Sequence, residues 1–166
     1  NRPKQEVDFL MDLFRRYFKK NLEKKYPDVR FNIMGDLSKC PEDIRESALK
    51  LMEKTKNNTK YTFNLAFNYS GQQEILNAVN NIVLSGKTNL SKEDFEEFLY
   101  TNGQPALDFV IRTSGEQRLS NFMLWQVAYA ELYFTQTNWP AFNKKHLVKA
   151  LDEYQKRDRR FGAIKK

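Results

Sequence analysis

The sequence predicts an α/β domain in which a mostly parallel central sheet is flanked by helices. Four short segments, 29–34, 61–68, 108–111 and 132–134, have the apolar content of strands, and each is followed by turn residues and then a helical pattern. Strands that alternate with helical segments favour parallel pairing, because the chain must return along the sheet before it can pair again. We therefore expect one domain over residues 1–166, with ligands at the carboxyl ends of its strands.

The composition is that of a globular domain with basic character. The 166 residues are 40% hydrophobic and 14% aromatic, which is enough for a core. A formal net charge of +7 favours an anionic partner, either a pyrophosphate, an anionic membrane surface or a nucleic acid, and charge alone does not choose among them. The single Cys40 excludes an internal disulfide. No apolar stretch is long enough to cross a bilayer and no signal peptide is recognisable, so we expect a cytoplasmic protein.

The first part of the chain predicts a helix, a strand and a second helix. Pro3 suits a first helical turn, and apolar residues then recur at steps of three and four as far as Leu22. We expect this apolar stripe to face the core. The strand at 29–34 closes with a Gly-Asp pair, after which Pro41 begins the second helix.

The middle of the chain predicts a strand and two further helices. The strand at 61–68 runs into Ser70 and Gly71, and the helix that follows ends at Gly86. Ser91 and Asp94 have the spacing of a capping box, which predicts a short helix over 92–100.

The strand at 108–111 leads into a loop with two cationic residues. Arg112 stands at the carboxyl end of the strand, Arg118 lies in the loop, and Ser120 or Asn121 is a good N-cap for an apolar helix over 122–130. A helix amino terminus has free N–H groups and a partial positive charge. Two guanidiniums and a hydroxyl in front of such a terminus would therefore form a cradle for a phosphate or pyrophosphate.

Glu131 follows this apolar segment and requires a cationic partner. A partly buried carboxylate at the end of an apolar helix opposes the helix dipole. Mg²⁺ would serve as the partner, since it takes one or two carboxylates together with phosphate oxygens. The alternative is that Arg112, Arg118 and Glu131 form an ordinary ion-pair network around a solvated loop.

Six strings of the sequence carry a resemblance to a known family. They are IRTSGEQRLSNFMLWQVAYAELYF at 111–134, WP at 139–140, RRFG at 159–162, NRP at 1–3, GD at 35–36 and NYSG at 68–71. Together they resemble the cis-prenyltransferase family, and within it the bacterial undecaprenyl pyrophosphate synthases. The resemblance implies Mg²⁺-dependent, sequential addition of isopentenyl pyrophosphate to farnesyl pyrophosphate, with each new double bond cis. The product implied is the lipid carrier of bacterial cell-wall synthesis.

The resemblance also implies roles for particular residues. Arg112, Arg118 and Ser120 would hold the pyrophosphate of isopentenyl pyrophosphate, and Glu131 would help to position Mg²⁺. The family's Asp-Gly-Asn-x-x-Trp motif, whose aspartate promotes ionisation of the allylic pyrophosphate, does not occur in this sequence. We therefore expect a domain that lacks its first strands, and we assign no catalytic residue within it.

Four further residues complete the predicted site, three of them by matching positions that the family places near substrate. Arg2 matches an arginine near the allylic phosphates, and Asn68 could add a donor to a phosphate site. Arg160 and Gly162 match an Arg-x-Gly ending that reaches the pyrophosphate site across a homodimer interface. The implied partners are thus the two substrates, a second copy of the chain and the membrane surface at the inner face, where the lipid product is released.

Two alternatives from other classes remain. The first is a non-catalytic partner subunit of a prenyltransferase complex, which could lack the aspartate motif and still contribute the Arg-x-Gly ending. The second is a basic nucleic-acid-binding domain, whose sign would be a steep dependence of binding on salt. No nucleic-acid recognition motif is present, so we expect no nucleic acid among the partners.

Overall fold

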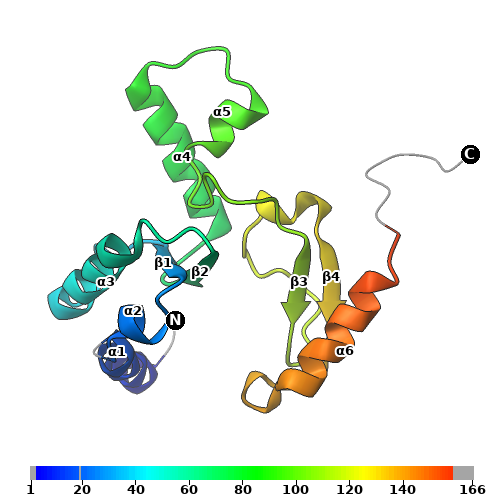
Figure 1. Ribbon diagram of the computed structural model, residues 1–166. Helices are drawn as coiled ribbons and strands as arrows, with labels where there is room; N and C mark the ends of the chain where they lie inside the picture. The colour runs from blue at the N-terminus through cyan, green and yellow to red at the C-terminus, as the bar shows by residue number, and fades with distance from the viewer. Residues whose placement is uncertain (1–2, 19, 159–166) are drawn as a thin grey trace, which may run out of the picture. The chain divides into compact units, whose positions relative to one another are not determined.

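A computed structural model describes residues 3–18 and 20–158 of the chain. The chain divides into two compact units, Asn1–Tyr69 and Ser70–Lys166. Within the described residues each unit contains helices and a pair of parallel strands (Figure 1). The predicted α/β class with parallel strands is therefore confirmed. In the described residues the strands form two separate pairs rather than the single sheet that was expected.

The first unit is built around a strand–helix–strand motif. Strand β1 (Val29–Met34) pairs in parallel with β2 (Tyr61–Ala66), from Val29 opposite Tyr61 to Met34 opposite Ala66, and α3 (Glu42–Thr55) connects them. The core lies between β1 and α3 and contains the apolar residues Phe31, Ile33, Met34, Ile44, Ala48 and Leu51. Buried Thr55 joins the two elements, because its hydroxyl accepts from the Phe31 N–H at 3.0 Å and donates to the Leu51 carbonyl at 2.9 Å.

The first helix is shorter than its apolar pattern predicts. Helix α1 (Lys4–Phe18) is followed by a separate four-residue helix, α2 (Leu22–Lys25), and Asn21 between them has a φ of 49°. A left-handed residue cannot continue a right-handed helix. Within this unit Phe14 meets Phe67 edge-on at 4.5 Å, and Arg15 pairs with Asp43 on α3 at 2.6 Å. No residue of α1 is fully buried, so its stripe is only partly covered.

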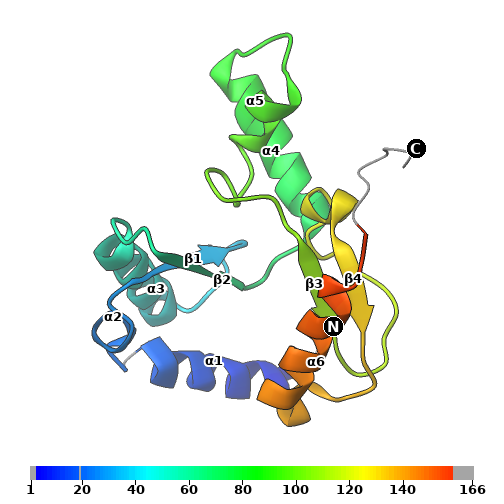
Figure 2. The same ribbon diagram turned by 45° about the vertical axis from the view of Figure 1, so that its right-hand side comes forward.

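The second unit combines a helical hairpin with the other strand pair. Helices α4 (Gly71–Ser85) and α5 (Lys92–Glu96) precede β3 (Phe109–Arg112) and β4 (Glu131–Phe134), which pair in parallel from Phe109 opposite Glu131 to Arg112 opposite Phe134. Short 3₁₀ helices lie at η1 (Gln126–Tyr129) and η2 (Trp139–Ala141). Helix α6 (Lys144–Gln155) lies beside the strand pair (Figure 2), with Ala150 buried and the Tyr154 ring packed at a tilt against Phe109, 4.9 Å between ring centroids.

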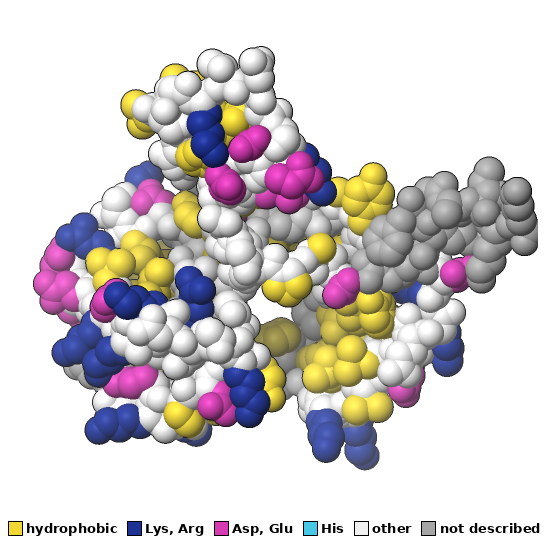
Figure 3. Space-filling model, turned by 45° about the horizontal axis from the view of Figure 1, so that its top comes forward, with side chains coloured by type: hydrophobic (Ala, Val, Ile, Leu, Met, Phe, Trp, Pro, Cys, Tyr) yellow, Lys and Arg dark blue, Asp and Glu magenta, His cyan; other side chains and the backbone are white. Residues whose placement is uncertain are grey.

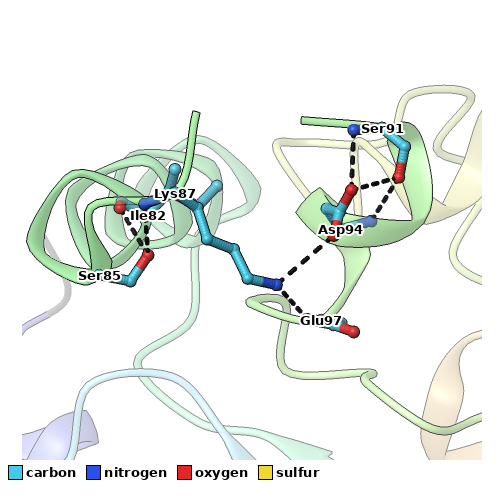
Figure 4. Close-up of polar contacts among 6 residues, drawn as sticks. All are labelled: Ile82, Ser85, Lys87, Ser91, Asp94 and Glu97. Atoms are coloured by element: carbon cyan, nitrogen blue, oxygen red, sulfur yellow. Dashed lines mark hydrogen bonds and ion pairs between the residues drawn. The ribbon is translucent and has the colours of Figure 1, made fainter. Parts of the chain in front are cut away.

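The α4–α5 hairpin closes through the capping residues that the sequence predicts. Gly86 ends α4 with a φ of 71°, and Ser91 and Asp94 form a complete capping box at the start of α5. Lys87 lies between the two helices and pairs with Glu97 at 2.8 Å and with Asp94 at 3.4 Å (Figure 4). These contacts, together with buried Ala78, Ile82 and Leu99, make the hairpin a defined support for the segments that pack on it.

The predicted helix over 122–130 is wrong. Residues 120–125 form turns, and only Gln126–Tyr129 is helical, as a 3₁₀ turn. Ser120, Asn121 and Met123 have φ values of 50°, 63° and 47°, which an α-helix cannot include. The apolar side chains in this segment instead pack irregularly. Met123 is buried, and the Trp125 ring packs at a tilt against Phe95 of α5, 4.4 Å between ring centroids.

The capping box gives a prediction for acid stability. Hydrogen bonds from the Ser91 hydroxyl and N–H lower the pKa of Asp94, with a smaller contribution from Lys87. A lowered folded-state pKa means that the stabilisation is present above about pH 4 and is lost as the pH falls through the lowered value. We expect Asp94→Asn to lower the thermal unfolding midpoint at neutral pH, with a difference from wild type that shrinks below about pH 4.

Thermal melts followed by circular dichroism from about pH 6 to about pH 3 measure this difference across the titration range. Asp8→Asn, a change of the same type at an exposed position of α1, is the control. A difference between wild type and Asp94→Asn that stays constant with pH would contradict the electrostatic account.

Candidate functional site

Arg112 is placed by the strand that ends with it. Strand β3 finishes at Arg112, and the Arg112 carbonyl accepts from the Thr135 N–H at 2.9 Å just after β4. The predicted position at a strand's carboxyl end is therefore confirmed. The residue is half-buried, so the strand pair restricts where the guanidinium can reach.

The loop after Arg112 is fixed to the chain that follows β4. The Ser114 N–H donates to the Thr137 carbonyl at 3.0 Å, and the Gly115 N–H donates to the Thr135 carbonyl at 2.8 Å. Gly115 has a φ of 71°, a conformation that glycine adopts without strain. The turn's N–H groups are thus used within the protein, and the loop starts from a fixed point.

Arg118 and Ser120 lie further along the same loop and are exposed. Arg118 forms an ion pair with Glu116, two residues before it, and 63% of its side chain remains accessible. An exposed pair of this kind contributes at most about 1 kcal/mol, so an anionic ligand can replace Glu116 at little cost. The structure therefore carries Arg112, Arg118 and Ser120 on one loop at the carboxyl end of β3.

The helix amino terminus expected behind this loop is supplied by a different helix. Asn121, which the sequence suggested as an N-cap of its own helix, lies against the start of α4. The Gly71 N–H donates to the Asn121 carbonyl at 2.8 Å, and the Gln72 N–H donates to Asn121 Oδ1 at 2.9 Å. The Gln73 N–H donates to the Ser70 hydroxyl at 3.4 Å. The first three N–H groups of α4 thus have protein acceptors, and the charge for an oxyanion at this loop would have to come from side chains.

Glu131 lies at the other end of the strand pair from Arg112. It is the first residue of β4 and is paired with Phe109, three positions before Arg112, a separation of about 10 Å along a strand. Its Oε2 atom accepts from Arg157 Nη1 at 2.7 Å, and about a third of each side chain is accessible. The cationic partner of Glu131 in the structure is therefore Arg157.

The described residues do not by themselves form a Mg²⁺ site. Across residues 3–18 and 20–158, no three His, Cys, Asp or Glu side chains gather as a possible ligand set. Glu131 is committed to Arg157 and does not share a loop with Arg112 or Arg118. The assignment of Glu131 to Mg²⁺ stays a prediction of the resemblance.

The remaining residues of the predicted site have other positions. Asn68 lies in the first unit with a φ of 47°, and its Nδ2 group donates to the Asp36 carbonyl at 3.0 Å, which holds the turn after β1. Arg2, Arg160 and Gly162 fall outside the described residues. Of the predicted residues, Arg112, Arg118 and Ser120 share one stretch of chain, from the end of β3 into the loop that follows it.

Sequence reasoning missed the role of Glu74. It is only 3% exposed, and its Oε1 atom accepts from the Tyr100 N–H at 2.9 Å and from Gln126 Nε2 at 3.1 Å. The sequence does carry a signal for this burial, because Glu74 lies on the same helical stripe as Ala78 and Ile82, four and eight residues later. An acidic residue is favourable in a first helical turn, so the position of Glu74 could be explained without burial.

Comparisons with known proteins show the family of the chain. A family model described as putative undecaprenyl diphosphate synthase matches residues 1–162. An isoprenyl transferase of Fusobacterium nucleatum is 49% identical over 168 residues, covering 99% of this chain and 72% of that protein. An isoprenyl transferase of Thermotoga maritima is 44% identical, covering 98% and 72%.

Two solved structures share the fold. Lavandulyl diphosphate synthase from Lavandula x intermedia, in complex with dimethylallyl diphosphate, has a TM-score of 0.89 at 34% identity, covering 98% of this chain and 73% of that one. A probable undecaprenyl diphosphate synthase from Campylobacter jejuni has a TM-score of 0.83 at 35% identity, covering 97% and 76%. No helix among the described residues has the length and hydropathy needed to cross a membrane. The chain belongs to the undecaprenyl diphosphate synthase family of prenyltransferases.

Proposed function

We propose that this chain elongates a prenyl chain by condensing isopentenyl pyrophosphate units onto farnesyl pyrophosphate, giving undecaprenyl pyrophosphate for bacterial cell-wall synthesis. The observation that carries the proposal is the loop at the carboxyl end of β3, with Arg112, Arg118 and Ser120 on it. Membership of a prenyltransferase family supports prenyl diphosphate substrates. The complex of lavandulyl diphosphate synthase with dimethylallyl diphosphate supports the same class of ligand.

The loop suits a pyrophosphate for chemical reasons. A guanidinium keeps its charge throughout the physiological pH range and offers planar, bidentate donors to phosphate oxygens. Arg112, half-buried at the end of a strand, supplies the fixed contact. Arg118, exposed and paired only with nearby Glu116, can turn toward the ligand. The Ser120 hydroxyl adds a neutral donor beside them.

The chemical step involves two pyrophosphates, one that leaves and one that is retained. The allylic carbon–oxygen bond breaks and its pyrophosphate leaves, while the double-bond electrons of isopentenyl pyrophosphate form the new carbon–carbon bond and a proton is lost. In this proposal Arg112, Arg118 and Ser120 hold the pyrophosphate that does not leave. Their task is to orient the attacking double bond. Correct placement of the two reactants can remove a large part of the activation barrier.

The other partners stay predictions of the resemblance. A homodimer, delivery of product at the membrane surface and a Mg²⁺ requirement follow from it. Neither the partner-subunit alternative nor the nucleic-acid alternative gains a specific observation. Lys and Arg as well as Asp and Glu side chains lie on the face drawn in Figure 3.

Replacing Arg118 with Ala tests the assignment of the loop. Loss of a charged hydrogen bond of about 1.5–3 kcal/mol should raise the KM for isopentenyl pyrophosphate by about 10- to 100-fold. The KM for farnesyl pyrophosphate should change by less than about threefold, because that pyrophosphate is held elsewhere. Incorporation of radiolabelled isopentenyl pyrophosphate into butanol-extractable product measures both constants.

Arg45→Ala is the matched control for Arg118→Ala. Arg45 forms an exposed local ion pair with Glu42 on α3, similar to the pair of Arg118 with Glu116, but lies outside the loop. It should leave both KM values unchanged. If Arg118→Ala raised the two KM values equally, the loop would not be the isopentenyl pyrophosphate site.

The ion pair between Glu131 and Arg157 gives a second prediction. Because each partner is about one-third accessible, Glu131→Gln and Arg157→Gln should each lower the thermal unfolding midpoint by about 2–4 °C, to the same extent. If the pair has only this structural role, both variants should keep the wild-type dependence of activity on Mg²⁺ concentration. The metal role implied by the resemblance would instead show as a raised Mg²⁺ requirement in Glu131→Gln alone.

A further inference from the structure

We infer that Asn121 is a positioning residue, which fixes segment 118–120 of the pyrophosphate loop on the first turn of α4. The inference rests on the proposed function, since it concerns how the residues of that site are held. Asn121 itself is not assigned a contact with substrate. It directly follows Ser120 and lies three residues after Arg118.

Asn121 binds the start of α4 through all of its polar groups except its own N–H. Its carbonyl accepts from the Gly71 N–H at 2.8 Å, and its Oδ1 atom accepts from the Gln72 N–H at 2.9 Å. Its Nδ2 group donates to the Ser70 hydroxyl at 2.7 Å. A side-chain amide supplies a donor and an acceptor on separate atoms, and Asn121 uses both here, one toward Ser70 and one toward Gln72.

The backbone at this point supports the same interpretation. Ser120 and Asn121 are both left-handed, with φ values of 50° and 63°, a conformation in which Asn is several-fold enriched among non-glycine residues. Gly71 allows the close approach, because a Cβ there would lie 2.9 Å from Leu124 Cγ and 3.1 Å from the Asn121 carbonyl oxygen. The side-chain contacts of Asn121 thus hold two unusual backbone conformations, one of them at Ser120.

Two further contacts hold the chain after Asn121 on the same hairpin. The Trp125 indole N–H donates to Glu96 Oε1 at 2.9 Å, which lowers the pKa of Glu96. Gln126 Nε2 donates to buried Glu74 at 3.1 Å. The segment is therefore anchored from residue 121 onward, and Asn121 is the anchor nearest to the residues proposed to bind pyrophosphate.

The functional consequence follows from this placement. Residues 116–120 lie between the point fixed at Gly115 and the point fixed at Asn121. If the second point is released, Ser120 and Arg118 sample more positions, and a ligand must order them when it binds. Affinity for the pyrophosphate held by this loop should fall, whereas the site for the other pyrophosphate should be unaffected.

The test uses three variants and one control in the protein that carries this sequence. Asn121→Gly keeps the left-handed backbone and the main-chain carbonyl but removes both side-chain hydrogen bonds. Ser70→Ala removes the hydroxyl that Asn121 Nδ2 donates to, and the double variant combines the two. Asn89→Gly is the matched control, because Asn89 is also left-handed, with a φ of 55°, but lies in the loop between α4 and α5.

We expect Asn121→Gly to raise the KM for isopentenyl pyrophosphate at least about fivefold and the KM for farnesyl pyrophosphate less than about twofold. Ser70→Ala should act in the same direction, by about threefold. The double variant should raise the KM for isopentenyl pyrophosphate no more than Asn121→Gly does, because Asn121→Gly already removes the hydrogen bond to Ser70, and the other contact of the Ser70 hydroxyl, with the Gln73 N–H, lies within the start of α4. Asn89→Gly should behave like wild type. If Asn121→Gly acted only by lowering the stability of the protein, the KM values for the two substrates would change together.

Equal rises in both KM values, or an unchanged KM for isopentenyl pyrophosphate in Asn121→Gly, would overturn the inference. If circular dichroism shows that Asn121→Gly does not fold, Ser70→Ala decides, and an unchanged KM in that variant overturns it. Failure of the proposed function would be a separate result: either wild type forms no product, or Arg118→Ala leaves both KM values unchanged. If wild type and Arg118→Ala behave as proposed while Asn121→Gly does not, only the positioning role fails.

Discussion

The second unit depends on how the first turn of α4 satisfies its backbone. A helix begins with N–H groups that have no partner within the helix, and leaving them unpaired costs free energy. In this chain the Ser70 hydroxyl and the carbonyl and amide of Asn121 accept from the first three of them. One of those residues lies about fifty positions further along the chain. The requirement of one helix for acceptors therefore decides the course of a distant loop.

The hydrogen bonding at the start of α4 limits which groups can supply charge to the site. A helix amino terminus is a common place for a phosphate, but here its N–H groups are already committed to protein acceptors. Positive charge for a pyrophosphate must then come from side chains, and in the proposed function Arg112 and Arg118 supply it from positions of different exposure. Arg112 is half-buried at the end of the strand pair, whereas Arg118 is exposed and held by a weak local pair. In that proposal α4 supports the loop while the arginines bind.

Local signals predicted the elements well, and long-range contacts explain where prediction failed. The strand at Val29–Met34, the Gly86 helix end and the Ser91–Asp94 capping box all depend on neighbouring residues, so the sequence displays them. The apolar run at 122–130 predicted a helix because periodicity counts side chains and cannot register that Asn121 is needed by α4. The sequence pattern could not identify Arg157 as the partner of Glu131 either, because the two residues lie 26 positions apart. The roles of Arg112 and Arg118 came from the resemblance, because spacing alone left an ordinary ion-pair network open.

Glu74 shows why the hairpin, the loop and the start of β4 should respond together. A buried carboxylate is tolerated only when donors surround it, and losing one donor leaves the full cost of its burial. Tyr100 brings a donor from beyond α5, and Gln126 brings one from the 3₁₀ helix that leads into β4. Asn121 contacts α4 at Gly71 and Gln72, and Gln126 contacts it at Glu74, about one helical turn further along. The segment from Ser120 to Gln126 is therefore held at both ends by one helix. A change in the packing of α4 therefore reaches the pyrophosphate loop through hydrogen bonds rather than through the strands that carry Arg112.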